Sequence, residues 1–178
     1  MQRVGQNRNF RGQSSRESRN GGQTGSRYDR GVILLLRHGE AEPDQGGGDA
    51  ARRLTAKGEA QSVAAGRAIA RLGLEVDLCL ASPRVRAKDT ARLACEALGL
   101  VPEITDPIGS GDYDTLELVA GRGNVMLVGH EPVLSMEVAR LTGARIKLKK
   151  GGLAGLDRGV LRLLLRPVEL AAISDPPG

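Results

Sequence analysis

Short apolar runs alternate along the chain with longer segments in which apolar residues recur at helical spacing. Continuous apolar runs predict strands buried on both faces, and the periodic segments predict helices that pack against them. The predicted strands are residues 32–36, 78–81 and 125–128, with a further strand at 101–104. The predicted helices are residues 56–72, 84–98 and 132–141, with a weaker helix at 116–120.

Glycine, proline and threonine mark the ends of these segments. Thr55 is placed to cap the first helix, Gly73 and Gly99 to end the first two, and Pro132 to occupy the first turn of the last one. Residues 153–156 and 160–165 are joined by Asp-Arg-Gly, which predicts a hairpin. Strands that alternate with helices predict an α/β three-layer sandwich with a mostly parallel central sheet, helices on both faces and a C-terminal hairpin that adds an edge strand.

The composition changes sharply near residue 31. Residues 1–30 hold seven arginines, no lysine and two acids, and they consist otherwise mainly of Gly, Gln, Asn and Ser. Such a segment buries too little apolar surface to fold, so we expect a disordered tail. It carries the whole net charge of +5, because the rest of the chain has 19 basic and 19 acidic residues. Weak contact with nucleic acid through this tail is one hypothesis, and a solvated tail without a partner is the other.

The remaining chain fits one domain, at residues 31–166, followed by a short C-terminal extension at 167–178. No apolar run is long enough to cross a bilayer, and the first residues lack the apolar segment of a secretory signal. We therefore expect a cytoplasmic protein without membrane contact. Cys79 and Cys95 lie among apolar neighbours and are expected to be buried, reduced thiols.

Both histidines of the chain follow predicted strands directly. His38 stands in Arg37-His38-Gly39, and His130 stands in Gly129-His130-Glu131. In an open α/β sheet, the carboxyl ends of the strands form the crevice where ligands bind. Ser82 follows a third strand, and Arg86 lies in the first turn of the helix after it. Three strand ends therefore bring two imidazoles and two guanidiniums to one edge of the sheet.

This set of side chains suits phosphoryl transfer. Arginine presents a planar, permanently charged fork that fits phosphate oxygens, and a largely neutral histidine can act as a nucleophile. Nearby arginines should lower the histidine pKa and keep its lone pair free. Two histidines without clustered carboxylates or thiolates are too few ligands for a catalytic zinc, so we expect no metal and no cofactor.

Three ordered motifs resemble those of the histidine phosphatase superfamily, the phosphoglycerate mutase-like proteins. They are Leu36-Arg37-His38-Gly39-Glu40, the segment from Ser82 to Ala91, and Val128-Gly129-His130-Glu131-Pro132. The resemblance covers about residues 32–166. It implies that His38 is phosphorylated during turnover and that Arg37, Arg86 and His130 hold the phosphoryl group.

Within this superfamily, the short domain and the motifs at residues 53–58 and 149–154 look like the compact SixA-type phosphohistidine phosphatases. That resemblance implies a further arginine facing the phosphate, for which Arg52 fits best and Arg53 is the alternative. Together with Arg52, the expected substrate-binding residues are Glu40, Ser82 and Glu131. The glycine-rich loop at 45–49 and the region at 106–114 follow no family pattern.

The resulting hypothesis is a metal-independent phosphatase that works by double displacement through a phosphohistidine intermediate. A phosphomonoester needs a general acid, and none stands out among Glu40, Asp49 and Glu131. This favours a phosphohistidine in a protein as substrate, because its leaving imidazole is less basic than an alkoxide. A small phosphorylated metabolite is the alternative substrate. An inactive nucleic-acid-binding module is the alternative of another class.

Overall fold

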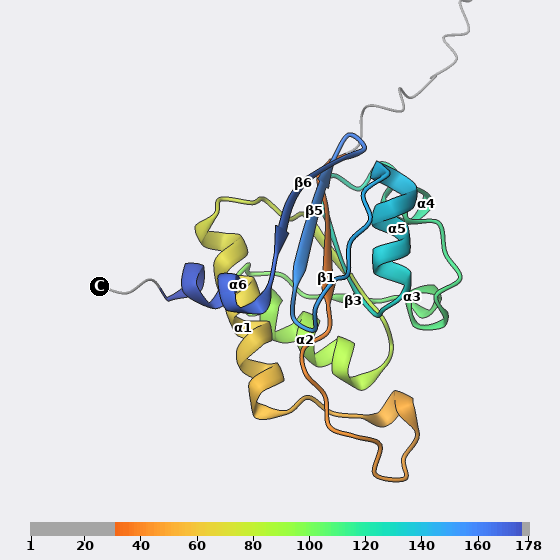
Figure 1. Cartoon of the computed structure of the whole chain (residues 1–178), viewed down its shortest axis with the longest axis vertical. Coiled ribbons are helices and arrows are strands. Elements are labelled where there is room, and N and C mark those ends of the chain that lie inside the picture. The colour runs from red at the N-terminus through yellow and green to blue at the C-terminus, as the bar shows by residue number, and fades with distance from the viewer. Residues whose placement is uncertain (1–30, 176–178) are drawn as a thin grey trace, which may run out of the picture.

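Six strands form one mixed sheet in the order β3-β2-β4-β1-β5-β6 (Figure 1). Strands β1, β2, β3 and β4 are parallel, whereas β5 runs antiparallel to β1 and forms a hairpin with β6 at the sheet edge. The predicted α/β architecture, its mostly parallel sheet and its C-terminal edge hairpin are therefore confirmed. The strand bounds are β1 Ile33–Arg37, β2 Leu78–Ala81, β3 Glu103–Ile104, β4 Val125–Gly129, β5 Leu153–Asp157 and β6 Val160–Leu165.

Helices cover both faces of this sheet, as Figure 1 shows. One face carries α1 (Ala56–Arg71), α2 (Val85–Glu96) and α6 (Pro167–Ser174). The other carries α3 (Asp106–Ser110), α4 (Thr115–Val119) and α5 (Val133–Thr142). Alternate side chains of each strand point to opposite faces, so each layer of helices packs on its own apolar cluster.

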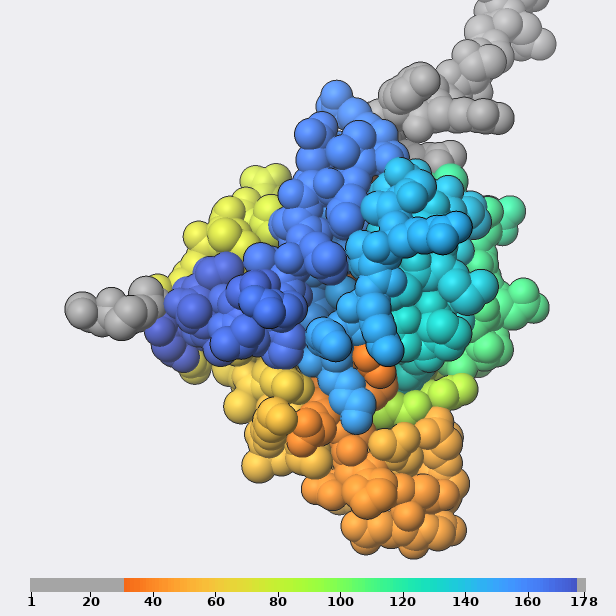
Figure 2. Space-filling view, viewed as in Figure 1, coloured from red at the N-terminus to blue at the C-terminus, as the bar shows by residue number. Residues whose placement is uncertain are grey.

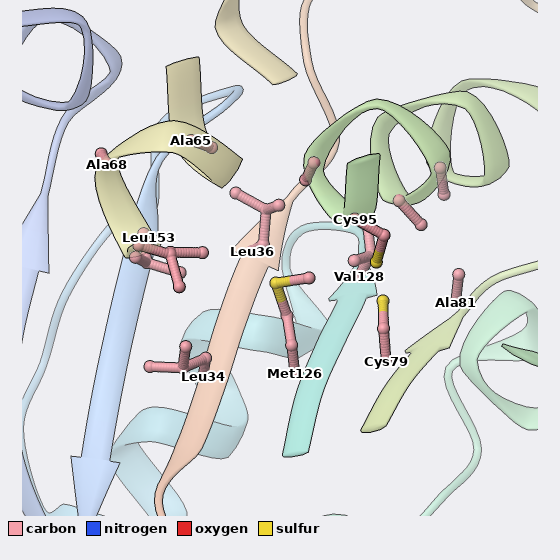
Figure 3. Close-up of a cluster of buried hydrophobic side chains, with 14 of the residues drawn as sticks. Leu34, Leu36, Ala65, Ala68, Cys79, Ala81, Cys95, Met126, Val128 and Leu153 are labelled. Atoms are coloured by element: carbon pink, nitrogen blue, oxygen red, sulfur yellow. The ribbon is translucent and has the colours of Figure 1, made fainter. Parts of the chain in front are cut away.

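The first cluster is built mainly from aliphatic side chains and sulfur, because the chain has so few aromatic residues. Leu34, Leu36, Met126 and Val128 project from β1 and β4 toward small residues of α1 and α2 (Figure 3). Cys79 and Cys95 lie in the same cluster as buried free thiols, and their sulfur atoms face each other. The small side chains of α1 and α2 let both helices lie close to the sheet. The first turn of α2 therefore lies near the ends of the strands.

Local chemistry agrees with the predicted helix ends. The Thr55 hydroxyl accepts the backbone N–H of Gly58 at 3.0 Å and so caps α1. Gly73 and Gly99 take the positive φ of 66° that lets the chain leave a helix. Predicted and observed helix bounds differ by at most two residues, as expected where a helix end frays.

The structure contains three short elements for which the apolar pattern gave no signal. They are α3, a 3-10 turn η1 at Asp49–Ala51, and α6 in the segment that was expected to be a C-terminal extension. Leu170 of α6 is fully buried in the first cluster, and α6 packs along α1. The folded unit therefore reaches residue 175.

This computed structural model describes residues 31–175. The predictions of a disordered tail at 1–30 and of its contact with nucleic acid lie outside the described residues. Within them, no helix combines the length and the apolar character needed to cross a membrane.

Gly66 offers a test of the packing of α1 on α2. A Cβ at this position would run into the backbone carbonyl of Ala94. In an exposed helix interior, Gly→Ala raises the free energy of unfolding by about 1 kcal/mol. At Gly66 the added methyl group would overpack the contact with α2, so the substitution should lower the free energy of unfolding instead. We expect Gly66→Ala to lower the free energy of unfolding by about 1–3 kcal/mol in urea titrations. The exposed Arg71→Ala on the same helix is the control, with an expected change within about 0.5 kcal/mol. Stabilisation by Gly66→Ala would contradict this close helix contact.

Candidate active site

The site lies where β1, β4 and β2 end side by side. Arg37 is paired with Gly129 across β1 and β4, and Ala81 is paired with Val128 across β2 and β4. The next residues along the three strands are His38, His130 and Ser82, all of which are buried. The sheet register therefore places the predicted residues at one level of the carboxyl edge. The His38 and His130 ring centroids are 5.1 Å apart.

The neighbours of His38 determine which ring nitrogen carries its lone pair. Its Nδ1 lies 2.7 Å from the carbonyl oxygen of Gly39. A carbonyl can only accept, so Nδ1 must carry the hydrogen and donate. In the neutral ring, Nε2 is then the free base. The Arg86 Nε–H donates to this Nε2 at 3.2 Å, which agrees with that assignment. Nε2 is thus the ring nitrogen that carries the lone pair.

Arg86 is the charged group at the centre of the site. Its side chain is only 4% exposed, and it lies in the first turn of α2 as the sequence predicts. Besides its bond to His38, its guanidinium donates to the Asp49 carboxylate at 2.9 Å and to the Asp49 backbone carbonyl. Both outer nitrogens of Arg86 are therefore engaged by η1.

His130 contacts Ser82 rather than a carboxylate. Its Nε2 lies 2.8 Å from the Ser82 hydroxyl, which also accepts the backbone N–H of Arg84 at 3.3 Å. When that hydroxyl donates to Nε2, Nδ1 of His130 carries a hydrogen. This Nδ1 is buried and has no partner among residues 31–175. A buried donor without a partner is available for an oxygen or nitrogen of a substrate.

Both imidazoles are held neutral near pH 7. Burial, which disfavours the charged ring, lowers the pKa of His38 to about 4, and the charges of Arg86 and Arg37 lower it further while the Gly39 carbonyl opposes them. Burial also lowers the pKa of His130 to about 3, with additional lowering by His38, Arg86 and Arg84. The expectation that neighbouring arginines depress the histidine pKa is correct, but desolvation is the larger cause.

Arg37 approaches the site from the opposite side to Arg86. One of its terminal nitrogens donates to the Leu148 carbonyl at 2.8 Å, while its Nε is buried without a partner among the described residues. Burial lowers the pKa of the Arg37 guanidinium, and the charge of Glu131 opposes that shift. The backbone N–H of Gly151 also donates to the His38 carbonyl at 2.9 Å. The segment before β5 thus holds the Arg37-His38 turn in place.

Asp49 connects three arginines and was not assigned a binding role from the sequence. Its carboxylate accepts from Arg86 and Arg84 at 2.9 Å and from Arg52 at 3.0 Å. Hydrogen bonds from Arg86 and then Arg52 lower the pKa of Asp49 to about 2, so it is ionised at neutral pH. Arg52 therefore reaches the site through Asp49, whereas Arg53 is exposed. The glycine-rich run before Asp49 gave no signal of this contact.

The two expected glutamates lie apart from the histidine pair. Glu40 accepts from the exposed Lys57 amine at 2.9 Å, and this contact lowers its pKa. Glu131 accepts from the Ser135 hydroxyl at 2.7 Å. The structure therefore brings together His38, His130, Arg86 and Ser82, with Arg37 alongside. Arg52, Glu40 and Glu131 are peripheral to that group.

Within residues 31–175, no three His, Cys, Asp or Glu side chains lie close enough together to hold a metal ion. The site contains neutral imidazoles and two guanidiniums, and two of its buried nitrogens, Arg37 Nε and His130 Nδ1, have no partner among the described residues. These groups complement a tetrahedral anion, since phosphoryl transfer spreads negative charge over the oxygens around phosphorus.

Comparison with known proteins identifies the same family. The model of the histidine phosphatase superfamily (branch 1) matches residues 33–117, which include His38 and Arg86. An uncharacterized protein of Picosynechococcus sp. is 33% identical over 144 residues, which is 74% of this chain and 87% of that protein.

Solved structures share the fold over almost their whole length. A protein described as a phosphohistidine phosphatase SixA from Agrobacterium tumefaciens has a TM-score of 0.68 and 26% identity, over 78% of this chain and 99% of that chain. The protein histidine phosphatase SixA complexed with tungstate has a TM-score of 0.66 and 23% identity over the same shares. The alpha-ribazole phosphatase from Shigella flexneri, with a TM-score of 0.58 and 21% identity, covers 76% of this chain and 96% of that chain. On this evidence, the chain belongs to the histidine phosphatase superfamily and has the compact form of its SixA-like members.

Proposed function

We propose that this protein hydrolyses phosphoryl groups through a phosphohistidine intermediate on His38, without a metal, and that its substrate is phosphohistidine in a protein. The observation that supports the nucleophile is the hydrogen bond from His38 Nδ1 to the Gly39 carbonyl. This bond fixes the neutral tautomer of His38, in which Nε2 carries the lone pair. Nε2 accepts from Arg86 at 3.2 Å, and the ring centroids of His38 and His130 are 5.1 Å apart.

The reaction takes two displacements at phosphorus. His38 Nε2 attacks in line, the bond from phosphorus to the leaving group breaks, and the guanidiniums of Arg37 and Arg86 neutralise the oxygens. Because the Nε2 lone pair accepts from Arg86, the Arg86 Nε–H must turn from Nε2 to a phosphoryl oxygen as the attack begins. Water attacks the phosphohistidine in the second step, the bond from phosphorus to His38 breaks, and inorganic phosphate leaves.

The surroundings of the carboxylates support a leaving group that needs little help from an acid. Asp49 has a pKa of about 2 and is ionised, Glu40 is paired with Lys57, and Glu131 is bonded to Ser135. A phosphohistidine whose other ring nitrogen already carries a proton from solvent releases neutral imidazole, which is far less basic than an alkoxide, so its departure needs no acid from the protein. When water attacks the phosphohistidine on His38 in the second step, its proton passes to solvent.

A small-molecule phosphatase of the same fold is the second candidate. The similarity to the alpha-ribazole phosphatase favours it, because that protein has the same architecture.

A cytoplasmic location remains a prediction from the sequence.

Removing the nucleophile is the first test. With a phosphoramidate donor in excess chelator, rapid-quench labelling should give wild-type protein an acid-labile, alkali-stable phosphoryl label. We expect His38→Ala to lose this label and to lose turnover by roughly 10⁴-fold or more. His130→Ala is the matched control, in which label should still form, although slowly. Equal turnover in wild type and His38→Ala, or turnover abolished by chelator, would rule out this mechanism.

The two histidines also allow a direct test of the protonation states. Tag-free protein has only two imidazoles, so nitrogen NMR should resolve both without mutation. We expect titration midpoints near pH 4 for His38 and near pH 3 for His130, with the His38 proton on Nδ1 at pH 7.

The same shifts set the direction of the pH dependence. The unfolded chain takes up protons on histidine near pH 6.5, whereas the folded chain does not until about pH 4. Stability contributed by the buried neutral rings is therefore present above pH 6.5 and falls as the pH drops from 6.5 toward 4. Turnover should persist to about pH 5, and midpoints near 6.5 for both rings would contradict the buried, neutral site.

Asp49 provides the third test, because its two roles predict different results. As a resident anion on Arg86, it must be displaced by the substrate, so Asp49→Asn should tighten inhibition by inorganic phosphate by about three- to tenfold. As a general acid, it would be needed for phosphomonoesters but less for phosphoramidates. A selective loss of phosphomonoester turnover of ~10²-fold, without tighter phosphate binding, would assign it the acid role. Arg52→Gln, which removes one partner of Asp49 but keeps the carboxylate, is the comparison variant.

A further inference from the structure

A groove opens beside Arg37, on the side of the site away from Asp49. It has a volume of about 620 Å³ and lies between α5 and the segment at 144–150. Figure 2 shows this segment, in mid-blue, running between α5 in cyan and the β5–β6 hairpin in darker blue. The volume is larger than one phosphoryl group requires, so the groove has room for the part of a substrate that bears the phosphoryl group.

The walls of the groove are joined to the active site by hydrogen bonds. The Ser135 hydroxyl of α5 donates to the Glu131 carboxylate at 2.7 Å and accepts the Leu148 N–H at 3.1 Å. The Leu148 carbonyl in turn accepts from Arg37 at 2.8 Å. The groove is therefore preformed and continuous with a phosphate-binding arginine, and binding there need not first order a loop.

The charged residues in and beside the groove are mostly positive. Arg145 and Lys147 are exposed residues of the groove lining, and the exposed Lys149 lies just beyond it on the same segment. Leu148 is buried in the second core cluster, and the partly buried Ile146 packs against that cluster. Among the described residues, none of these three cations has an acidic partner within 4 Å. Glu131 is the acid in the lining, and it lies beside Arg37.

The floor of the groove is apolar and adaptable. Pro132, Met136, Ala139 and Ile146 contribute to it, and Met136 is 62% exposed. The flexible methionine side chain adapts its shape to different partners, and an exposed methionine in an apolar surface is typical of a binding site. A small anion such as phosphate would leave this floor open, whereas a peptide would cover it.

The spacing of the cations also fits a polypeptide. Exposure alternates along residues 145–149, so Arg145, Lys147 and Lys149 face solvent while the residues between them are half-buried or buried. Alternate acidic side chains on one side of an extended partner can meet such cations in turn. We propose that this groove binds an acidic segment of a phosphorylated protein substrate, adjacent to its phosphorylated side chain. The proposal rests on the proposed function and names the feature by which the substrate would be recognised.

Two phosphohistidine peptides test it, identical except that one carries Asp or Glu at alternate flanking positions and the other carries Gln. The variant is Arg145→Gln, Lys147→Gln and Lys149→Gln combined. Each exposed charge pair contributes little, so three together should lower kcat/KM for the acidic peptide by about tenfold. Turnover of the neutral peptide and of free phosphoramidate should change less than about twofold, because these cations do not contact the phosphoryl group.

The control removes the same net charge elsewhere. Arg71, Arg92 and Arg122 are exposed residues outside the groove, so their combined change to Gln should leave the preference for the acidic peptide intact. Added salt should reduce this preference in wild type and have little effect in the groove variant. Equal loss for both peptides, or no preference in wild type, would overturn the proposal.

Binding separates this proposal from the proposed function. The unphosphorylated acidic peptide, labelled for fluorescence anisotropy, should bind wild type about tenfold tighter than the groove variant, whether or not the enzyme accepts phosphohistidine. Peptide binding without phosphohistidine turnover would retain the groove and reject the substrate of the proposed function. Turnover without groove-dependent peptide binding would do the reverse. A single-stranded oligonucleotide that binds the groove more tightly than the peptide would overturn the choice of an acidic protein.

Discussion

The pairing of β4 with both β1 and β2 determines the position of His38, His130 and Ser82. Because the three strands are parallel and end at the same level, the residues that follow them meet without any long loop. Backbone hydrogen bonds extend the ladder one step further, from His38 N–H to the Gly129 carbonyl and from Ser82 N–H to the Val128 carbonyl. His38 is thus held by the sheet itself, and a shift of one residue in register would turn it to the other face.

The start of α2 is coupled to the same edge by a small buried network. Thr90 donates to the Arg86 carbonyl at 2.7 Å and accepts the Gly39 N–H at 3.0 Å. Ser62 of α1 donates to the Thr90 hydroxyl at 3.3 Å. These contacts fix the backbone on both sides of the His38–Arg86 pair. The core below, with its small helix residues, allows the two helices to come close enough for this network to form.

Much of this arrangement could be predicted from the sequence, because it follows from local pattern. Apolar runs locate the buried strands, Thr55 and Gly73 locate the ends of α1, and the residues after the strands locate His38, Ser82 and His130. Segments without a periodic pattern of apolar residues allowed fewer predictions. α6 was missed because Leu170 packs on α1 from a segment of only eight residues, in which one buried leucine sets no pattern. The contact of Asp49 with three arginines was missed because it joins residues up to 37 positions apart.

Charge balance explains the part of the site that was hardest to predict. Arg86 is buried, and a buried cation requires an anionic partner. The Asp49 carboxylate of η1 is that partner. It therefore occupies guanidinium nitrogens to which a phosphoryl oxygen would otherwise bind. Among residues 31–175, no carboxylate forms a hydrogen bond with Arg37, although Glu131 lies beside it, and the groove lining also holds the exposed Arg145 and Lys147. The two guanidiniums thus face different surroundings, one closed by an internal anion and one open toward an external partner. Under the proposed function, an anionic substrate that enters from the Arg37 side passes the exposed Arg145 and Lys147 first and competes with Asp49 only when it reaches Arg86. This difference between the two sides gives the site a direction of approach.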